Sequence, residues 1–214
     1  MLTDLQDRPE EEEEEPYDEF ENQAFHPYNV MLMLVLFGIC ALFLAFSAAF
    51  VYSRVQSDLP PIKVPILFVL NTLILLASSA TIVWAKRSYL ADHTANYIKA
   101  LWWTNGLSIF FMVMQFIAWG QLFEENILPS SDNSAGYLYV LSIMHFLHVV
   151  AGLPFLLMFL WVAKKRMKEP VSVLVYFSDP DKRLKLRLLT IYWHFLDALW
   201  IYLVLFLYIN YLIR

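Results

Sequence analysis

The most regular feature of this chain is a series of five apolar stretches separated by polar links. Each stretch is near or above the ~20 residues that an α-helix needs to cross the hydrocarbon core of a bilayer. In lipid the backbone must satisfy its own hydrogen bonds, and runs of this length leave only helices as spanning structures. The pattern therefore predicts an all-α integral membrane protein, a five-transmembrane-helix bundle with spans at about 30–51, 64–85, 100–123, 136–163 and 186–213.

Composition agrees with this pattern, and the basic residues indicate an orientation. Hydrophobic residues make up 59% of the 214 residues and aromatic residues 17%, which excludes an ordinary soluble domain. Cytoplasmic loops of membrane proteins carry an excess of lysine and arginine. We expect the N-terminus in the cytoplasm and the C-terminus outside, because that places twelve basic residues inside and only Arg54, Lys63 and Arg214 outside.

The N-terminal segment differs from the rest of the chain. Eleven of the twenty acidic residues precede Asn22, including the unbroken run from Glu10 to Glu15. Such a run repels itself and stays solvated, so we expect residues 1–26 to form an acidic, disordered cytoplasmic tail and residues 27–214 to form the membrane domain. The single cysteine, Cys40, lies within the first span and is expected to be a small core residue.

The link before the last span is the longest of the internal links. Basic residues flank a short apolar centre at 171–177, a composition suited to an inner leaflet with anionic lipids. Lys185 and Arg187, at the start of the last span, are therefore candidates for contact with lipid headgroups.

Ionisable residues within the spans are the candidate functional positions, because they are costly in hydrocarbon unless they face protein or water. His145 and His148 lie in the fourth span, and His194 and Asp197 in the fifth. Counting ~1.5 Å per residue puts His145 level with Asp197, and His148 level with His194, near the middle of the membrane. We expect an interhelical polar cluster that fixes the packing of the last two helices. Haem ligation, metal ligation and a proton relay are alternatives for the same residues.

The same residues carry a family resemblance, to cytochrome c oxidase subunit III of the haem-copper oxidases. The last span resembles the family's final-helix signature, and three further motifs follow in the family's order. They are Tyr192-Trp193-His194-Phe195-x-Asp197-x-x-Trp200, His145-x-x-His148-Val149-x-x-Gly152, the segment Asn71-Thr72 to Ser78-Ser79, and Gln115-x-x-x-Trp119. The end of the first span, Ala48-Ala49-Phe50 to Arg54, is also similar to the family.

The resemblance implies the five-helix bacterial form of the subunit, in the cytoplasmic (inner) membrane. Such a subunit binds neither haem nor copper, packs against the catalytic subunit I, holds phospholipid and supports turnover and proton uptake there. The complex would reduce oxygen to water with electrons from cytochrome c, coupled to proton pumping. This chain would not contact the electron donor, and neither a metal nor a nucleic acid is expected as its ligand.

Other functions stay open, since the sequence departs from the family where buried acids are usual. The register near Cys40 offers no acid, Ala118 lies between Gln115 and Trp119, and Arg187 precedes Trp193 by six positions. A subunit of a quinol oxidase or of a nitric oxide reductase assembly is therefore an alternative. A standalone transporter is a third, although no inverted repeat and no Gly/Pro-broken helix supports it.

Overall fold

The computed structural model describes residues 27–57, 64–167 and 169–212, with the side chains of 170 and 171 excepted, and every element in this part is an α-helix. Five helices are long and apolar enough to cross a membrane: α2 (Pro27–Ser57), α3 (Ile66–Leu90), α4 (Thr94–Glu124), α5 (Asn133–Arg166) and α7 (Pro180–Leu212). The five expected spans are therefore present. The acidic tail, residues 1–26, lies outside the described residues, so its disorder stays a prediction.

The helix ends extend beyond most of the predicted limits. We expected the third span to start near residue 100 and the fifth near 186, whereas the helices begin at Thr94 and Pro180. The helix of the second span, α3, begins at Ile66, two residues later than expected, because Pro65 precedes it. Apolar runs mark the part of a helix that suits hydrocarbon, but capping groups and prolines mark its ends. The side chain of Asp132, for example, accepts a hydrogen bond of 2.7 Å from the Ala135 N–H at the start of α5.

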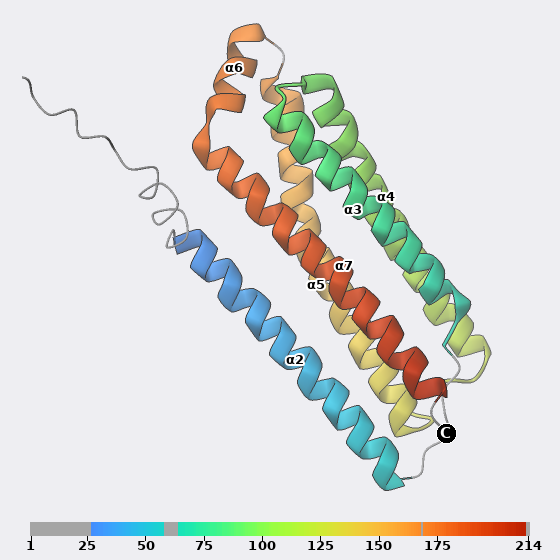
Figure 1. Cartoon of the computed structure of the whole chain (residues 1–214). Coiled ribbons are helices and arrows are strands. Elements are labelled where there is room, and N and C mark those ends of the chain that lie inside the picture. Colours follow the sequence, from blue (N-terminus) through green and yellow to red (C-terminus); the bar gives the residue numbers. More distant parts are fainter. Residues whose placement is uncertain (1–26, 58–63, 168, 213–214) are drawn as a thin grey trace, which may run out of the picture.

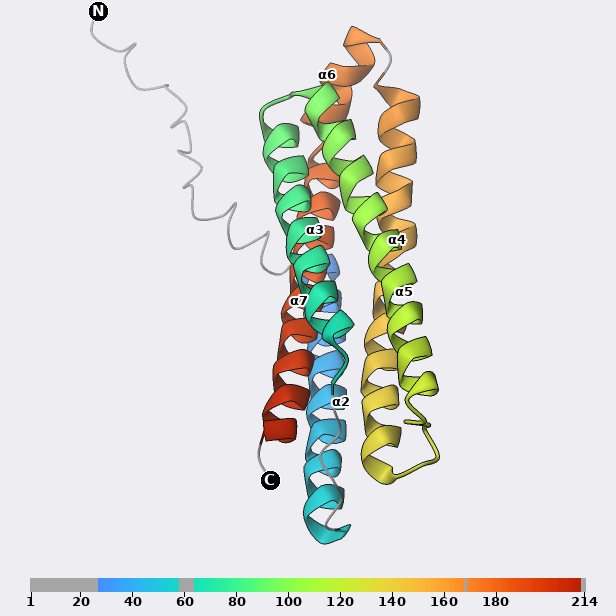
Figure 2. The same ribbon diagram turned by 90° about the vertical axis from the view of Figure 1, so that its right-hand side faces the viewer.

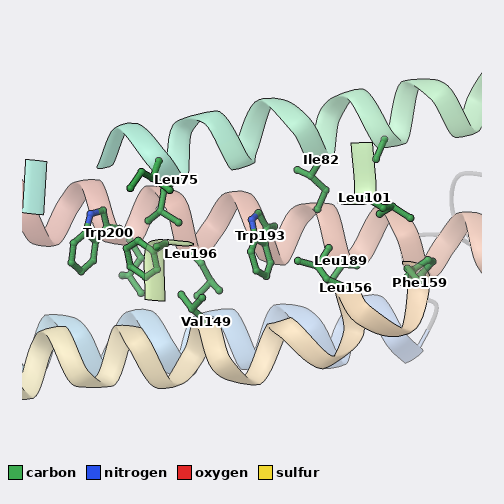
Figure 3. Packing of buried hydrophobic residues seen from close by; sticks show 14 of the residues in the cluster. Leu75, Ile82, Leu101, Val149, Leu156, Phe159, Leu189, Trp193, Leu196 and Trp200 are labelled. Atoms are coloured by element: carbon green, nitrogen blue, oxygen red, sulfur yellow. The ribbon is translucent and has the colours of Figure 1, made fainter. Parts of the chain in front are cut away.

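The helices form a ring with one helix outside it (Figures 1 and 2). α3 packs against α4, α4 against α5, α5 against α7, and α7 against α3, while α2 lies against α5 and α7. α7 is the most buried of the five spans and α2 the least. The hydrophobic core runs along this ring, where Val149 and Leu156 of α5 face Leu196 and Leu189 of α7 (Figure 3).

A short helix that the sequence did not reveal covers one end of the bundle. α6 (Pro170–Ser178) follows α5 and sits beside the turn between α3 and α4 (Figure 1). Its Tyr176 is buried, and the Tyr89 hydroxyl donates a 3.1 Å hydrogen bond to the Tyr176 carbonyl. The apolar centre at 171–177 is therefore a packed helix rather than a loop.

Candidate functional site

His145 lies at the centre of the bundle, but it does not bond to Asp197. Its side chain is fully buried, with the ring 4.9 Å from Trp200 of α7 and 5.9 Å from Phe111 of α4, centroid to centroid. Neither ring nitrogen of His145 and neither carboxylate oxygen of Asp197 has a hydrogen-bond partner among the described residues. The expected pairing of His145 with Asp197 is therefore wrong. The expected depth of His145 along α7 was right to within one helical turn. His145 lies against Trp200, however, which points about 60° around α7 from Asp197.

His194 and Asp197 face α3 instead of α5. The Ser79 hydroxyl and His194 Nδ1 share a hydrogen bond of 2.7 Å. Asp197 Oδ2 lies 3.9 Å from the same nitrogen, too far for a hydrogen bond. The His194 side chain is 39% exposed and that of Asp197 only 6%. The i, i+3 spacing placed both on one face of the helix, as expected, and α3 is the helix that this face meets.

His148 turns toward α2. Its Nδ1 donates a 2.6 Å hydrogen bond to the Met144 carbonyl of its own helix, and its ring lies 6.1 Å from Phe43. Its backbone carbonyl accepts a 2.9 Å hydrogen bond from the Tyr192 hydroxyl of α7. At this level α5 and α7 are therefore joined through Tyr192, and not through the expected pairing of His148 with His194.

The remaining polar motif residues link other pairs of helices. Asn71 Nδ2 donates a 2.8 Å hydrogen bond to Gln115 Oε1, and both fully buried side chains join α3 to α4. The indole N–H of Trp193 donates to Ser78 Oγ at 3.1 Å and joins α7 to α3. Thr72 differs, because its hydroxyl donates to the Phe68 carbonyl of its own helix at 3.0 Å.

Trp119 and Trp200 complete the set of motif residues. The indole N–H of Trp119 donates to Ser142 Oγ at 3.1 Å and joins α4 to α5. Trp200 is fully buried, and its ring lies 5.4 Å from Phe68 of α3 and 5.3 Å from Phe111 of α4. With the His145 ring also against it, Trp200 contacts three other helices.

At Gly152, α5 packs closely against two aromatic rings of α7. A Cβ at this position would lie 2.8 Å from Tyr192 Cε1 and 3.1 Å from Trp193 Cζ3. Real Cβ atoms do not approach carbon this closely, so any larger residue has to displace one of the two rings. The glycine in the motif is therefore required for the contact between α5 and α7.

A contact that the sequence did not predict joins α2 to α7. The Arg54 guanidinium contacts the Asn210 carbonyl, and its Nη1 lies 3.4 Å from Asn210 Oδ1. Arg54 and Asn210 lie at the same expected end of the first and fifth spans. Because α2 and α7 run parallel, their C-terminal ends meet, and this parallel course is the signal that would have paired Arg54 with Asn210.

Lys185 and Arg187 are exposed at the start of α7.

The three intramembrane histidines do not form a ligand set. They face Trp200, Met144 and Ser79 respectively. Within the described residues, no group of three histidine, cysteine, aspartate or glutamate side chains is placed to hold a metal ion. Most of the motif residues instead form contacts between neighbouring helices.

The sequence is similar to proteins of one known family. The family model described as "Cytochrome c oxidase subunit III" matches residues 28–211. The chain belongs to the cytochrome c oxidase subunit III family. It is 31% identical to cytochrome c oxidase subunit 3 of Papio hamadryas over 152 residues, which cover 71% of this chain and 52% of the relative. It is 27% identical to that of Pisaster ochraceus over 204 residues, which cover 87% of this chain and 73% of the relative.

Family membership and five spans make this a multi-pass membrane protein. The chain spans about half the length of several relatives that it matches, the Papio hamadryas protein among them.

Proposed function

We propose that the chain is an accessory, non-redox subunit III of a respiratory haem-copper oxidase in a bacterial cytoplasmic membrane. The complex would reduce oxygen to water with electrons from cytochrome c and pump protons. The observation that carries the proposal is the subunit III match over residues 28–211, with Gly152, Asn71 and Trp193 used in contacts between helices. Residues that hold neighbouring helices together stabilise a structural subunit.

The partner proposed for this scaffold is the catalytic subunit I, which would hold the haem and copper. Large apolar side chains are exposed along the spans, such as Phe37 at 75% and Leu34 at 67% on α2. In a membrane, such surfaces can face lipid or another subunit equally well, since lipid tails are as apolar as these side chains. A subunit that presents apolar faces around a core of hydrogen-bonded helices is suited to lateral packing against a larger membrane subunit.

The proposed orientation places the α6 end in the cytoplasm, with the N-terminus inside and the C-terminus outside. Ten of the eleven lysines and arginines in the described part lie at that end (Figure 1). The remaining one, Arg54, lies at the other end beside Asn210. This asymmetry supports the orientation through the positive-inside rule. We also propose that the subunit holds phospholipid, with Lys185 and Arg187 available to headgroups at the inner face.

The test is affinity purification of the full chain in mild detergent, with a reduced-minus-oxidised spectrum and mass spectrometry of the bound proteins. We expect an a-type haem spectrum, copper and a large subunit I. A b-type spectrum with a nitric oxide reductase subunit, or a quinol oxidase subunit without cytochrome c activity, would replace the proposal with that alternative. A colourless chain recovered alone would contradict it and favour a transporter.

Deletion of the chain tests the accessory role separately. The remaining complex should keep its haem spectrum, because the haems are held elsewhere, but lose oxygen consumption sooner during sustained turnover. Complementation with the chain carrying Gly106→Ala, where the added Cβ would enter open space, should restore wild-type lifetime. Loss of the haem spectrum on deletion would show instead that this chain holds a redox group.

A further inference from the structure

A hollow of about 520 Å³ lies between the end of α5, the helix α6 and the start of α7. Lys165 and Arg166 line it from α5, and Lys182 lines it from α7. Ser172 and Val175 of α6 form the facing wall. Its size falls within the range of ligand pockets, and it lies outside the contacts between spans described above.

The charges in the hollow favour an anion. Three cations line it, against the single carboxylate of Glu169. Lys182 also pairs with Asp179, and this hydrogen bond holds the pKa of the Asp179 carboxyl below its usual range. Lys165 and Arg166 have no ion pair with an acid among the described residues, so their charge is available to a ligand. The Ser172 hydroxyl adds a group that can donate a hydrogen bond to a phosphate oxygen.

The α6 wall is held in place by aromatic packing. Tyr176, which also lines the hollow, lies with its ring 6.1 Å from Tyr89 and 6.4 Å from Tyr97. Phe177 lies 5.1 Å from Tyr89, centroid to centroid. Burial raises the pKa of the Tyr176 hydroxyl, so at neutral pH this ring brings no negative charge to the hollow. The wall is therefore preformed, which lowers the entropic cost of binding.

The surroundings of the hollow are those of a membrane interface. Trp161, one turn before Lys165 on α5, is 61% exposed, and Lys165 Nζ lies 4.9 Å from its ring centroid. Tryptophan collects at the level of lipid headgroups. Leu174 and Val175 of α6 are 70% and 63% exposed, and Val175 lies at the edge of the hollow. A ligand that fits both surfaces carries an anionic group beside an apolar chain.

We propose that this hollow binds the phosphate of an anionic phospholipid, with Lys165 and Arg166 as its main contacts and the acyl chains along Trp161 and the exposed face of α6. This deepens the proposed lipid-holding role and rests on it. The site differs from the exposed Lys185 and Arg187, neither of which lines the hollow. It also lies at the α6 end of the bundle, outside the contacts between the spans.

The experiment compares two double variants of the full chain, purified with its complex. Lys165→Gln/Arg166→Gln removes two lining cations. Lys164→Gln/Arg183→Gln removes the same charge nearby, from side chains that do not line the hollow, Lys164 lying 4.4 Å over Trp102 instead. Each is titrated with phosphatidylglycerol and with phosphatidylcholine and read by native mass spectrometry. We expect the first variant to bind phosphatidylglycerol about tenfold more weakly, and the control to change by less than about twofold.

Three outcomes would overturn the site. The first is an equal loss of phosphatidylglycerol binding in both variants, which indicates general attraction to positive charge. The second is equal retention of phosphatidylglycerol and phosphatidylcholine by the wild type. The third is full displacement of phosphatidylglycerol by inorganic phosphate at matched concentration. Co-purification of the haem-containing subunit is measured in the same samples. Its loss from the wild type would contradict the proposed function, whereas its retention without phosphatidylglycerol preference would contradict only this site.

Discussion

At Gly152, replacement by alanine gives the sharpest test of the contact between α5 and α7. The added Cβ would lie 2.8 Å from Tyr192 Cε1 and 3.1 Å from Trp193 Cζ3, against the ~3.5–4.0 Å at which carbon atoms attract. Neither ring can move freely, because Tyr192 donates to the His148 carbonyl and Trp193 donates to Ser78. Relief of the clash therefore means separating the helices or breaking one of these hydrogen bonds.

The expected magnitude follows from three contributions. Overpacking a tight interface costs about 1–3 kcal/mol. Loss of one interhelical hydrogen bond adds about 0.6 kcal/mol, the average for such bonds in membranes. Alanine regains up to about 1 kcal/mol over glycine in helix propensity. We therefore expect Gly152→Ala to destabilise the protein by about 1–3 kcal/mol.

The assay is the thermal stability of the purified complex in mild detergent, together with the amount of this chain that it retains. Gly106→Ala on α4 and Gly38→Ala on α2 are matched controls, because no heavy atom lies within 4 Å of a Cβ at either position. Both controls should be neutral or slightly stabilising. If Gly152→Ala behaves as they do, the close approach of α5 and α7 is refuted.

A double-mutant cycle identifies the clashing ring. Tyr192→Leu removes the ring atom nearest to the added methyl group, so Gly152→Ala should cost much less in that background. Residues in contact show interaction energies of about 0.5–3 kcal/mol in such cycles. Additive costs would show that the methyl group does not meet Tyr192.

Three further predictions concern single contacts. Asn71→Leu and Gln115→Leu should each destabilise the protein by about 1–3 kcal/mol in thermal unfolding, because each leaves a buried amide unpaired, while the double variant should cost less than their sum. Ser79→Ala and His194→Ala should likewise be non-additive, with a coupling of about 0.6 kcal/mol, and additivity would place their hydrogen bond in doubt. Acidification should loosen the start of α7, as measured by amide hydrogen exchange. The Lys182 contact lowers the pKa of the Asp179 carboxyl in the folded protein. The ionised Asp179 therefore stabilises the fold above its unfolded pKa, and this stabilisation is lost as the pH falls through its folded pKa. Asp179→Asn should abolish that pH dependence.

The spans and their order were predictable from the sequence, because hydrocarbon imposes a minimum length of apolar helix. Helix ends were less predictable, since Asp132 and Pro180 act locally and leave no mark in average hydropathy. α6, at nine residues, is too short for its apolar face to be distinguished from a loop. Its position depends on Tyr176 meeting aromatic side chains from α3 and α4, which are distant in sequence.

The candidate site was likewise predictable only in part. Counting residues placed His145 within one turn of its true neighbour on α7, because the rise per residue is nearly constant. The rotation of each helix was not predictable, and the expected polar pairs failed for that reason. Rotation is set by how bulky side chains fill the space, and here Trp200, rather than the expected Asp197, lies against His145.

This dependence on rotation explains why the final-helix motif is so dense. Consecutive residues of a helix point about 100° apart, so neighbouring side chains can all contact other helices only if those helices surround them. Tyr192 reaches α5, Trp193 and His194 reach α3, and Trp200 meets α3, α4 and α5. Only the most enclosed helix of the bundle could carry this motif, and α7 is that helix. A helix at the edge, such as α2, would expose the same side chains to lipid, where an unpaired polar group costs several kcal/mol.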